Sequence, residues 1–284
     1  MTYRARTTGT ATRRAAWAIG LAVALGAGLV AAPAAQESGG RLNRIIEQFE
    51  AGEAALANEH WRIVSLEHNP FLVDDLEAFL GELVEQGGAR PRLTPIVRIP
   101  HEADQAYHHV VKQILDAGAM GIVLPQVRTA AEVDHLVRAM RYPPQAGAEY
   151  PEPRGRRGWG PTGARRVWSM DNDEYARRAD VWPLNPDGEL LAIIMIETRE
   201  SVENIDEILQ VPGLGGVLIG PSDLSLSLGV GTPAANPRAP EVEEAIETVG
   251  QACMRHNALC GIYTSSDVEA RGAQGYKLFP VPAR

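Results

Sequence analysis

Glu197 and Asp223 are the residues whose type and spacing point most directly to chemistry. Each acid follows a continuously apolar segment, 191–196 for Glu197 and 216–220 for Asp223, and such segments are typical of buried parallel strands. Parallel α/β folds place functional side chains at the carboxyl ends of their strands, so we expect the two acids side by side. Their hard oxygen ligands suit Mg²⁺ or Mn²⁺, with Co²⁺ or Zn²⁺ as alternatives. The other interpretation is that Glu197 caps a helix and Asp223 lies in a solvated loop.

Further polar residues stand where other predicted strands end, and they extend the candidate site around the same edge. These residues are Glu67, His68, Arg98, Gln126, Tyr263 and Thr264. An open doubly wound sheet would concentrate its functional residues at one switch point, whereas here they recur at nearly every strand. This distribution favours a closed barrel.

Strand patterns alternate with amphipathic helix patterns along the chain, which predicts an α/β fold of the (β/α)₈ TIM-barrel type. Seven segments have strand patterns: 62–66, 94–98, 121–124, 191–196, 216–220, 260–263 and 276–279. A weak eighth strand at 54–56 lies too close to the next one for a helix between them, which indicates a reduced first βα unit. The sequence Thr129-x-x-Glu132 predicts a capping box at the start of a helix.

The composition fits one large globular domain, which we expect over residues 41–284. Of the 284 residues, 45% are hydrophobic and 22% are charged, as is usual for a protein with a full core. The net charge of −9 argues against a general nucleic-acid binder. The segment 143–188 is rich in Pro, Gly and Arg and too long for a plain connector. We expect this insertion to be either a solvated excursion or a lid or subunit contact whose arginines meet acidic groups.

Residues 1–35 have the pattern of a targeting segment rather than of a folded domain. Arginines at positions 4, 6, 13 and 14 precede an Ala/Gly-rich apolar stretch, 15–30, and Ala32-Pro33-Ala34 resembles a cleavage site. The pair Arg13-Arg14 also resembles a twin-arginine signal. We therefore expect a periplasmic or secreted protein, and the alternative is an uncleaved membrane anchor.

The chain has two cysteines, Cys253 and Cys260. Export would permit a single disulfide between them. Cys253, however, lies on an apolar helix face, and this placement favours a buried free thiol.

Six segments occur in the order of a known family: 65–70 (SLEHNP), 95–100 (PIVRIP), 115–122 (LDAGAMGI), 141–144 (RYPP), 196–198 (IET) and 219–224 (IGPSDL). Together they resemble the HpcH/HpaI aldolase family of metal-dependent class II pyruvate aldolases, which are relatives of the citrate lyase beta subunit. The resemblance extends from about residue 61 to the C-terminus.

The resemblance implies a role for each matching polar residue. Glu197 and Asp223 would bind the divalent metal. Arg98 would face the keto oxygen of a 2-oxo acid and the enolate that develops on it. His68 would act as the general base, with Asp116 holding its imidazole.

The chemistry accounts for these residue types independently. Making or breaking a carbon–carbon bond next to a 2-oxo acid passes through an enolate, whose negative charge a metal and a guanidinium can spread. A histidine that titrates near neutrality can move the proton of the aldol hydroxyl. The resemblance adds that the backbone at Gly220, Pro221 and Ser222 would receive the pyruvate carboxylate.

Other reactive residue types fit less well. No lysine ends a matching strand, since Lys112 is expected in mid-helix and Lys277 within the last strand, which argues against a Schiff-base aldolase. The spacing of His101, His108 and His109 fits a polar helix start better than a second metal site.

The chain also departs from the typical family pattern. Ser65 stands in place of an aspartate and Met195 in place of a glutamine, both near the expected site. The sequence stops at 282–284 without the final helix that in relatives packs against a neighbouring subunit.

The leading hypothesis is an exported divalent-metal aldolase that cleaves or forms 4-hydroxy-2-oxo acids through a pyruvate enolate, with a 2-oxo acid and an aldehyde as its small-molecule partners. One alternative is a citrate-lyase-like enzyme for acyl-CoA thioesters, with the arginine-rich loop 154–166 as the contact. Another is a barrel that binds a 2-oxo acid or dicarboxylate without turnover. We expect a homo-oligomer, no nucleic-acid partner, and membrane contact only if the N-terminal segment stays uncleaved.

Overall fold

The structure is a computed structural model that describes residues 40–284, except 69–72, 86–89, 232, 265–266 and 281–284. The predicted targeting segment 1–35 lies outside the described residues. Residues 282–284, where the sequence analysis expected no final helix, also lie outside them. Among the helices that are described, none combines the length and the apolar character needed to cross a membrane.

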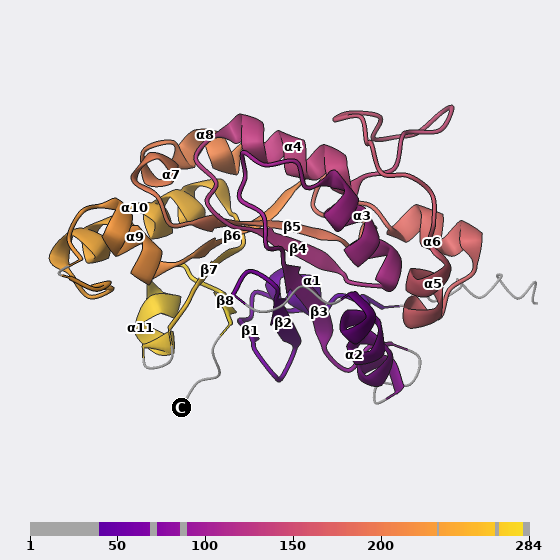
Figure 1. Ribbon diagram of the computed structural model, residues 1–284, viewed down its shortest axis with the longest axis horizontal. Helices are drawn as coiled ribbons and strands as arrows, with labels where there is room; N and C mark the ends of the chain where they lie inside the picture. Colours follow the sequence, from indigo (N-terminus) through magenta and orange to yellow (C-terminus); the bar gives the residue numbers. More distant parts are fainter. Residues whose placement is uncertain (1–39, 69–72, 86–89, 232, 265–266, 281–284) are drawn as a thin grey trace, which may run out of the picture. The chain divides into compact units, whose positions relative to one another are not determined.

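Eight parallel strands form one sheet that curls into a nearly closed barrel (Figure 1), which confirms the predicted fold. The strands are β1 (Ala55–Leu56), β2 (Trp61–Ser65), β3 (Thr94–Arg98), β4 (Gly121–Leu124), β5 (Leu191–Ile196), β6 (Leu214–Ile219), β7 (Cys260–Ile262) and β8 (Leu278–Phe279). Their order in the sheet is β1-β8-β7-β6-β5-β4-β3-β2, so β1 and β2 stand at its two ends.

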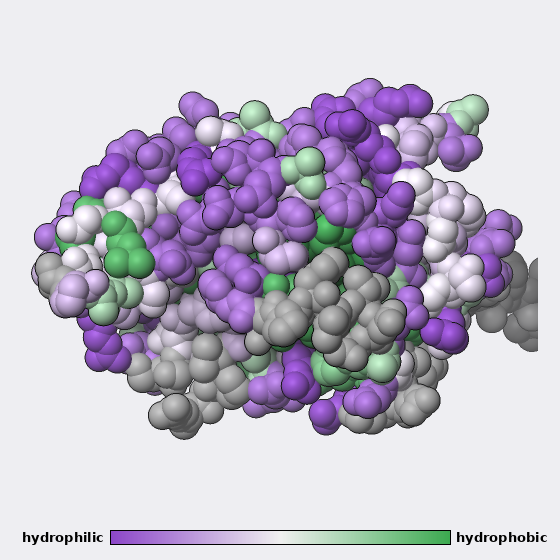
Figure 2. Space-filling view, viewed as in Figure 1, coloured by the Kyte–Doolittle hydropathy of each residue, from purple (hydrophilic) through white to green (hydrophobic). Residues whose placement is uncertain are grey.

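Helices surround the sheet and connect its strands. They are α1 (Arg44–Glu50), α2 (Val73–Glu85), α3 (His108–Ala117), α4 (Ala130–Met140), α5 (Thr162–Trp168), α6 (Asn172–Arg178), α7 (Arg199–Glu203), α8 (Ile205–Leu209), α9 (Pro221–Ser227), α10 (Pro240–His256) and α11 (Val268–Ala273). The predicted capping box of Thr129 and Glu132 opens α4. The insertion contains α5 and α6. The surface over α4, α7 and α8 is largely hydrophilic (Figure 2), as expected for amphipathic helices that cover a sheet.

Strand side chains divide between two apolar clusters, because successive residues of a strand point to opposite faces. In β5, Leu191, Ile193 and Met195 belong to an inner cluster that fills the barrel. The residues between them belong to an outer cluster that the strands share with the helices. Both faces of the sheet are therefore apolar, which explains why the strand sequences are continuously hydrophobic.

The first βα unit is reduced to a tight turn without a helix, as predicted. A single parallel bridge between Ala57 and Trp61 joins the ends of the sheet, and only residues 58–60 separate the bridged pair. Asn58 takes a left-handed conformation (φ 63°), which asparagine tolerates better than most residues, and its N–H donates to the carbonyl of Trp61 at 2.8 Å. Parallel strands normally need a crossover of about a dozen residues. The short turn between β1 and β2 therefore allows a single bridge rather than an extended ladder of hydrogen bonds.

Helix α1 closes the amino end of the barrel. Its residues Ile45 and Ile46 are wholly buried in the inner cluster. The N-cap residue Asn43 donates from its side chain to the carbonyls of Met120 and Glu189, which lie just before β4 and β5. The backbone N–H of Asn43 also donates to the buried carboxylate of Glu189 at 2.8 Å. These polar contacts fix the helix across the end of the barrel opposite the predicted site.

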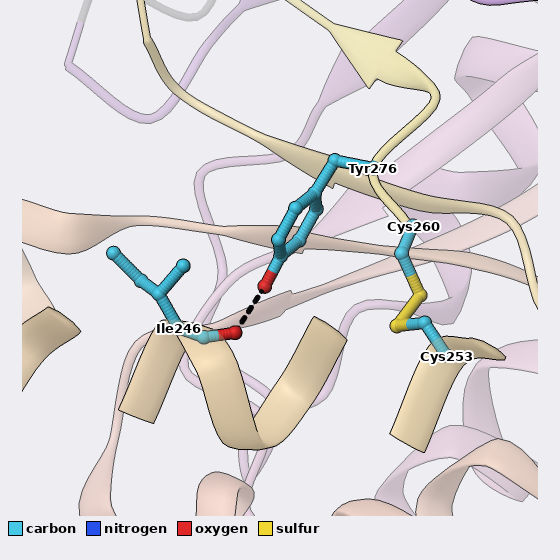
Figure 3. Close-up of a disulfide and its surroundings, with 4 residues drawn as sticks. All are labelled: Ile246, Cys253, Cys260 and Tyr276. Atoms are coloured by element: carbon cyan, nitrogen blue, oxygen red, sulfur yellow. Dashed lines mark hydrogen bonds between the residues drawn. A yellow bond between two sulfur atoms is a disulfide. The ribbon is translucent and has the colours of Figure 1, made fainter. Parts of the chain in front are cut away.

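Cys253 of α10 and Cys260 of β7 form a disulfide (Figure 3), so the prediction of a free thiol is wrong. The apolar face of α10 correctly indicated that Cys253 is buried. The prediction missed the turn at Asn257 (φ 48°), which returns the chain so that the two Cα atoms lie 6.2 Å apart. Tyr276 adds a second tie between α10 and the sheet, because its hydroxyl donates to the carbonyl of Ile246 at 2.7 Å (Figure 3).

Removing the disulfide should lower the free energy of unfolding by about 2–3 kcal/mol, because the link closes a short loop in the unfolded chain. We expect this loss for the Cys253→Ala/Cys260→Ala variant in urea unfolding under non-reducing conditions. Reduced wild-type protein is the matched control, since it loses the link but keeps both side chains. A wild-type unfolding midpoint that does not respond to reductant would contradict the disulfide.

Candidate active site

The predicted site residues of the strands gather at the carboxyl end of the barrel. Strand register aligns Ser65 at the end of β2 with Arg98 at the end of β3. It also aligns Ile196 with Ile219, so the residues that follow them, Glu197 and Gly220, are neighbours. The fold therefore brings the predicted arginine and one predicted metal ligand to the same edge of the sheet.

Glu197 is the most deeply buried acid of this group, with 2% of its surface exposed. Burial raises the pKa of its carboxyl to about 7. A hydrogen bond from the backbone N–H of Gln126, at 2.7 Å, opposes this rise in pKa. The negative charges of Asp223 and Glu67 raise the pKa further. The site therefore carries negative charge that its protein partners compensate only in part.

Gly220 makes room for the Glu197 carboxylate. A Cβ atom at this position would lie 2.7 Å from Oε2 of Glu197 and 2.9 Å from the terminal methyl of Met195. Gly220 also caps α9, with Pro221 as the first helical residue and Asp223 in the first turn. Asp223 is exposed, whereas Glu197 is buried, and the charge of Asp223 is near enough to raise the pKa of Glu197.

Of the predicted carboxylate-binding residues Gly220, Pro221 and Ser222, only Ser222 has an amide available to a ligand, and the next residue, Asp223, adds another. The N–H of Gly220 donates to the carbonyl of Ile196 at 3.2 Å, and Pro221 has no N–H. The amides of Ser222 and Asp223 belong to the first turn of α9, where a helix leaves its N–H groups without helical partners. The role of this segment in substrate binding stays a prediction.

Arg98 is held in place by neighbours on three sides. Its Nε and Nη2 atoms donate to the hydroxyl of Ser65 at 3.0 and 2.9 Å, and its Nη1 atom lies 3.7 Å from the sulfur of Met195. Nη1 also forms an ion pair with Oε2 of Glu67 at 2.7 Å. The guanidinium lies over the ring of Tyr263, 5.9 Å from its centre. The charge of Arg98 is thus fixed at the mouth of the barrel beside the acids.

Glu67 is a candidate site residue that the sequence analysis placed at the site without giving it a role. Its Oε2 atom pairs with Arg98 and also lies 3.4 Å from Nε2 of His68. His68 is much more open to solvent, with 68% of its side chain exposed. Glu67 therefore links the predicted base, His68, to the guanidinium of Arg98. The adjacent Glu-His pair in the sequence was the signal for this link, but spacing alone does not show which groups a side chain reaches.

The predicted contact between Asp116 and His68 is not formed. Helix α3 runs back from the carboxyl end of β3 to the start of β4, and Asp116 lies in its last turn, at the opposite end of the barrel from His68. The Oδ1 atom of Asp116 instead accepts a hydrogen bond from Nη2 of Arg157 at 2.7 Å. The resemblance supplied the residue but not the direction of the helix that carries it. A catalytic role for Asp116 stays a prediction without a supporting contact.

Arg157 anchors the insertion to the barrel. Its side chain is fully buried, its guanidinium lies 4.5 Å from the centre of the Tyr142 ring, and its Nη2 donates to the hydroxyl of Tyr175 at 2.9 Å. A cavity of about 980 Å³ lies beside it, lined by Trp159 and other insertion residues but by none of the predicted site residues. The insertion joins α4 to the start of β5, so this cavity is not part of the carboxyl-end site.

The donor set at the carboxyl end fits a hard divalent cation. Glu197 and Asp223 offer carboxylate oxygens, which Mg²⁺ and Mn²⁺ prefer. The pKa of Glu197 is raised first by burial and then by the negative charges of Asp223 and Glu67, which a cation would offset. Within the described residues no group of three or more His, Cys, Asp and Glu side chains gathers as a ready-made metal site. A cation here would therefore take its remaining ligands from substrate or solvent.

The sequence and the fold both match known proteins. The profile of HpcH/HpaI aldolase/citrate lyase matches residues 50–276. The chain belongs to this family. The hydroxypyruvate/pyruvate aldolase of Pseudomonas aeruginosa is 34% identical over 227 residues, which cover 80% of the chain and 74% of the relative. The 2-keto-3-deoxy-L-rhamnonate aldolase of Salmonella schwarzengrund is 33% identical over 197 residues, or 69% of the chain and 64% of the relative.

Solved structures agree with this assignment. An HpcH/HpaI aldolase/citrate lyase family protein from Burkholderia cenocepacia J2315 has a TM-score of 0.63 and 27% identity, covering 78% of this chain and 79% of its own. Membership of the HpcH/HpaI family confirms the resemblance seen in the six motifs. It also confirms the prediction that the chain is an enzyme of the carbon–carbon lyase class, a class II aldolase.

Replacing Gly220 with alanine should displace the Glu197 carboxylate, because the new Cβ would overlap it. We expect the aldolase activity of Gly220→Ala to fall by up to about a hundredfold, as for other small displacements of catalytic groups. Steady-state kinetics and circular dichroism would separate this loss from misfolding. Gly272→Ala is the control, because a Cβ there meets nothing within 4 Å. Equal activity of the two variants would contradict the placement of Glu197.

Replacing Glu67 with glutamine should release Arg98 and His68 from their shared carboxylate. We expect kcat/KM of Glu67→Gln to fall at least about tenfold, because the guanidinium loses the ion pair that orients it. The free energy of unfolding should change by less than about 1 kcal/mol, as for other partly exposed ion pairs. Glu59→Gln, at an exposed position in the turn before β2, should leave both quantities unchanged. Wild-type kinetics in Glu67→Gln would rule out the orienting role.

Proposed function

We propose that the chain is a divalent-metal-dependent aldolase that cleaves or forms 4-hydroxy-2-oxo acids through a pyruvate enolate. The observation that carries this proposal is the buried carboxylate of Glu197, which shares the mouth of the barrel with Asp223 and with the fixed cation of Arg98. The names of two relatives support the substrate class, because both describe aldolases of 2-oxo acids.

Glu197 and Asp223 are the residues that would hold the metal, with Mg²⁺ or Mn²⁺ as the ions that best suit their oxygens. When bound, such an ion acts as a Lewis acid toward the oxygens of the 2-oxo acid. Gly220 keeps the space around Glu197 open, and Gln126 orients its carboxylate through the backbone N–H. The protein thus positions the inner ligand before any substrate arrives.

Arg98 supplies the permanent positive charge next to the reacting carbonyl. In the cleavage direction the C3–C4 bond breaks, its electron pair moves toward C2, and negative charge grows on the keto oxygen. A guanidinium that is already fixed by Ser65 and Glu67 meets this charge without reorganising, which favours the transition state over the bound substrate. Tyr263 beneath the guanidinium limits its movement.

His68 moves the proton that the reaction requires. In cleavage it accepts the proton of the C4 hydroxyl, so that the aldehyde can leave, and C3 of the enolate is then protonated to give pyruvate. Its exposed position suits exchange of this proton with bulk water. The Oε2 atom of Glu67 lies 3.4 Å from Nε2 of the imidazole, close enough to orient the ring of the base.

The acyl-CoA alternative has less structural support than the aldolase proposal, and the structure does not test export or oligomerisation. The acyl-CoA alternative relied on the arginines of loop 154–166, but Arg157 is buried and paired with Asp116, which leaves fewer of them for a nucleotide. Export through the N-terminal segment and assembly into a homo-oligomer stay proposals alongside the enzymatic one.

Exchange of the pyruvate methyl protons with D₂O, followed by NMR, tests the enolate directly. We expect metal-dependent exchange by the wild-type protein, abolished by EDTA and reduced at least about a hundredfold in Glu197→Gln, because the inner ligand loses its charge. Glu200→Gln is the control, since Glu200 is exposed and lies one helical turn away. Absence of exchange with Mg²⁺, Mn²⁺, Co²⁺ and Zn²⁺ alike would overturn the proposed mechanism.

A further inference from the structure

A second group of titratable side chains lies outside the barrel, between α3 and α4. The two helices pack side by side (Figure 1), and they bring His108 at the start of α3 against His135 in α4. The centres of the two imidazole rings are 4.4 Å apart, with their planes inclined by 51°. Sequence spacing groups His108 with His101 and His109, whereas the fold pairs it with a histidine from the next helix.

Three polar atoms of this group are buried without a partner. Among the described residues, neither Nε2 of His108 nor Nε2 of His135 has a hydrogen-bond partner, and the same is true of the Tyr107 hydroxyl. The Tyr107 ring lies 5.4 Å from that of His135. Leaving such an atom unsatisfied destabilises the fold, and folded proteins contain few of them. Three together indicate a shared ligand.

His108 is suited to bind a metal in its neutral form. Burial lowers the pKa of His108, and the neighbouring charges of His135 and Arg156 lower it further. A neutral imidazole keeps a lone pair on one ring nitrogen, and this is the form that coordinates metals. Both residues are partly exposed, although their Nε2 atoms are buried.

We propose that His108 and His135 bind a transition-metal ion, Zn²⁺, Cu²⁺ or Ni²⁺, through their Nε2 atoms. Imidazole nitrogens prefer these ions, whereas Mg²⁺ prefers oxygen ligands, so this site differs in ligand type from the acids at the barrel mouth. The Tyr107 hydroxyl stays protonated, because burial raises its pKa, and it is available to hydrogen-bond a ligand water. The site does not depend on the proposed function.

The number of protein ligands sets the strength of the site. Structural zinc sites usually have four protein ligands. Here the described residues provide two imidazoles, with no third His, Cys, Asp or Glu close enough to complete a set. The cation of Arg156 near His108 weakens binding further. The bound ion is therefore exchangeable and keeps open positions.

Metal titration of untagged protein in excess Mg²⁺ tests the proposal. We expect the wild-type protein to bind one equivalent of Cu²⁺ or Zn²⁺ in isothermal titration, and binding to weaken at least about tenfold in His108→Ala and in His135→Ala. Zn²⁺ should raise the unfolding midpoint of the wild type and not that of the two variants. The matched control is the His101→Ala/His109→Ala variant, which removes another neighbouring pair of histidines. The ring centres of that pair are 6.0 Å apart in the wild type, and the variant should bind the metal as the wild type does.

Electron paramagnetic resonance of the Cu²⁺ complex identifies the ligands. The wild type should show hyperfine splitting from two nitrogen ligands, and each single variant from one. The far-ultraviolet circular dichroism and the metal-free unfolding midpoint of the variants report that they fold. Equal affinity in wild type and His135→Ala, or a two-nitrogen spectrum that persists in either variant, would overturn the proposal. Loss of binding in the His101/His109 control would overturn the choice of ligands.

Discussion

The buried carboxylate of Glu197 is the constraint around which the candidate site is built. A carboxylate loses most of its hydration when it is buried, and this cost must be offset by hydrogen bonds or by opposite charge. The chain provides one N–H donor from Gln126 and the distributed charge of Arg98, while Asp223 and Glu67 add negative charge. The pKa of about 7 records this imbalance. The proposed cation would supply the missing charge.

Arg98 shows how the departures from the family pattern act together. Ser65 and Met195, which stand where family members typically have an aspartate and a glutamine, both contact its guanidinium. Replacing two strongly polar neighbours with a hydroxyl and a thioether leaves Glu67 as its charged partner within hydrogen-bonding distance. The change therefore lowers the polarity around the residue that is proposed to meet the substrate carbonyl.

The sequence predicted the features that depend on local pattern and failed on those that depend on how elements meet. Continuous apolar runs identified the strands, and the strand-end position of Glu197 followed from the direction of parallel strands. The direction of α3 separates Asp116 from its expected partner, and the turn after α10 brings Cys260 back to Cys253. The contact between His108 and His135 likewise requires two packed helices. Spacing within one segment contains no information on such contacts.

The pairing of β1 with β8 has a consequence for how the chain reaches its native state. These strands come from opposite ends of the folded domain, and Ile45 and Ile46 depend on the completed barrel for their burial. During synthesis β1 therefore cannot pair with β8 until the last strand has left the ribosome. Contacts of such long sequence separation form late, and an unpaired edge beside bare apolar side chains favours association with other chains. Until β8 is complete, Ile45 and Ile46 of the nascent chain therefore lack their native cover.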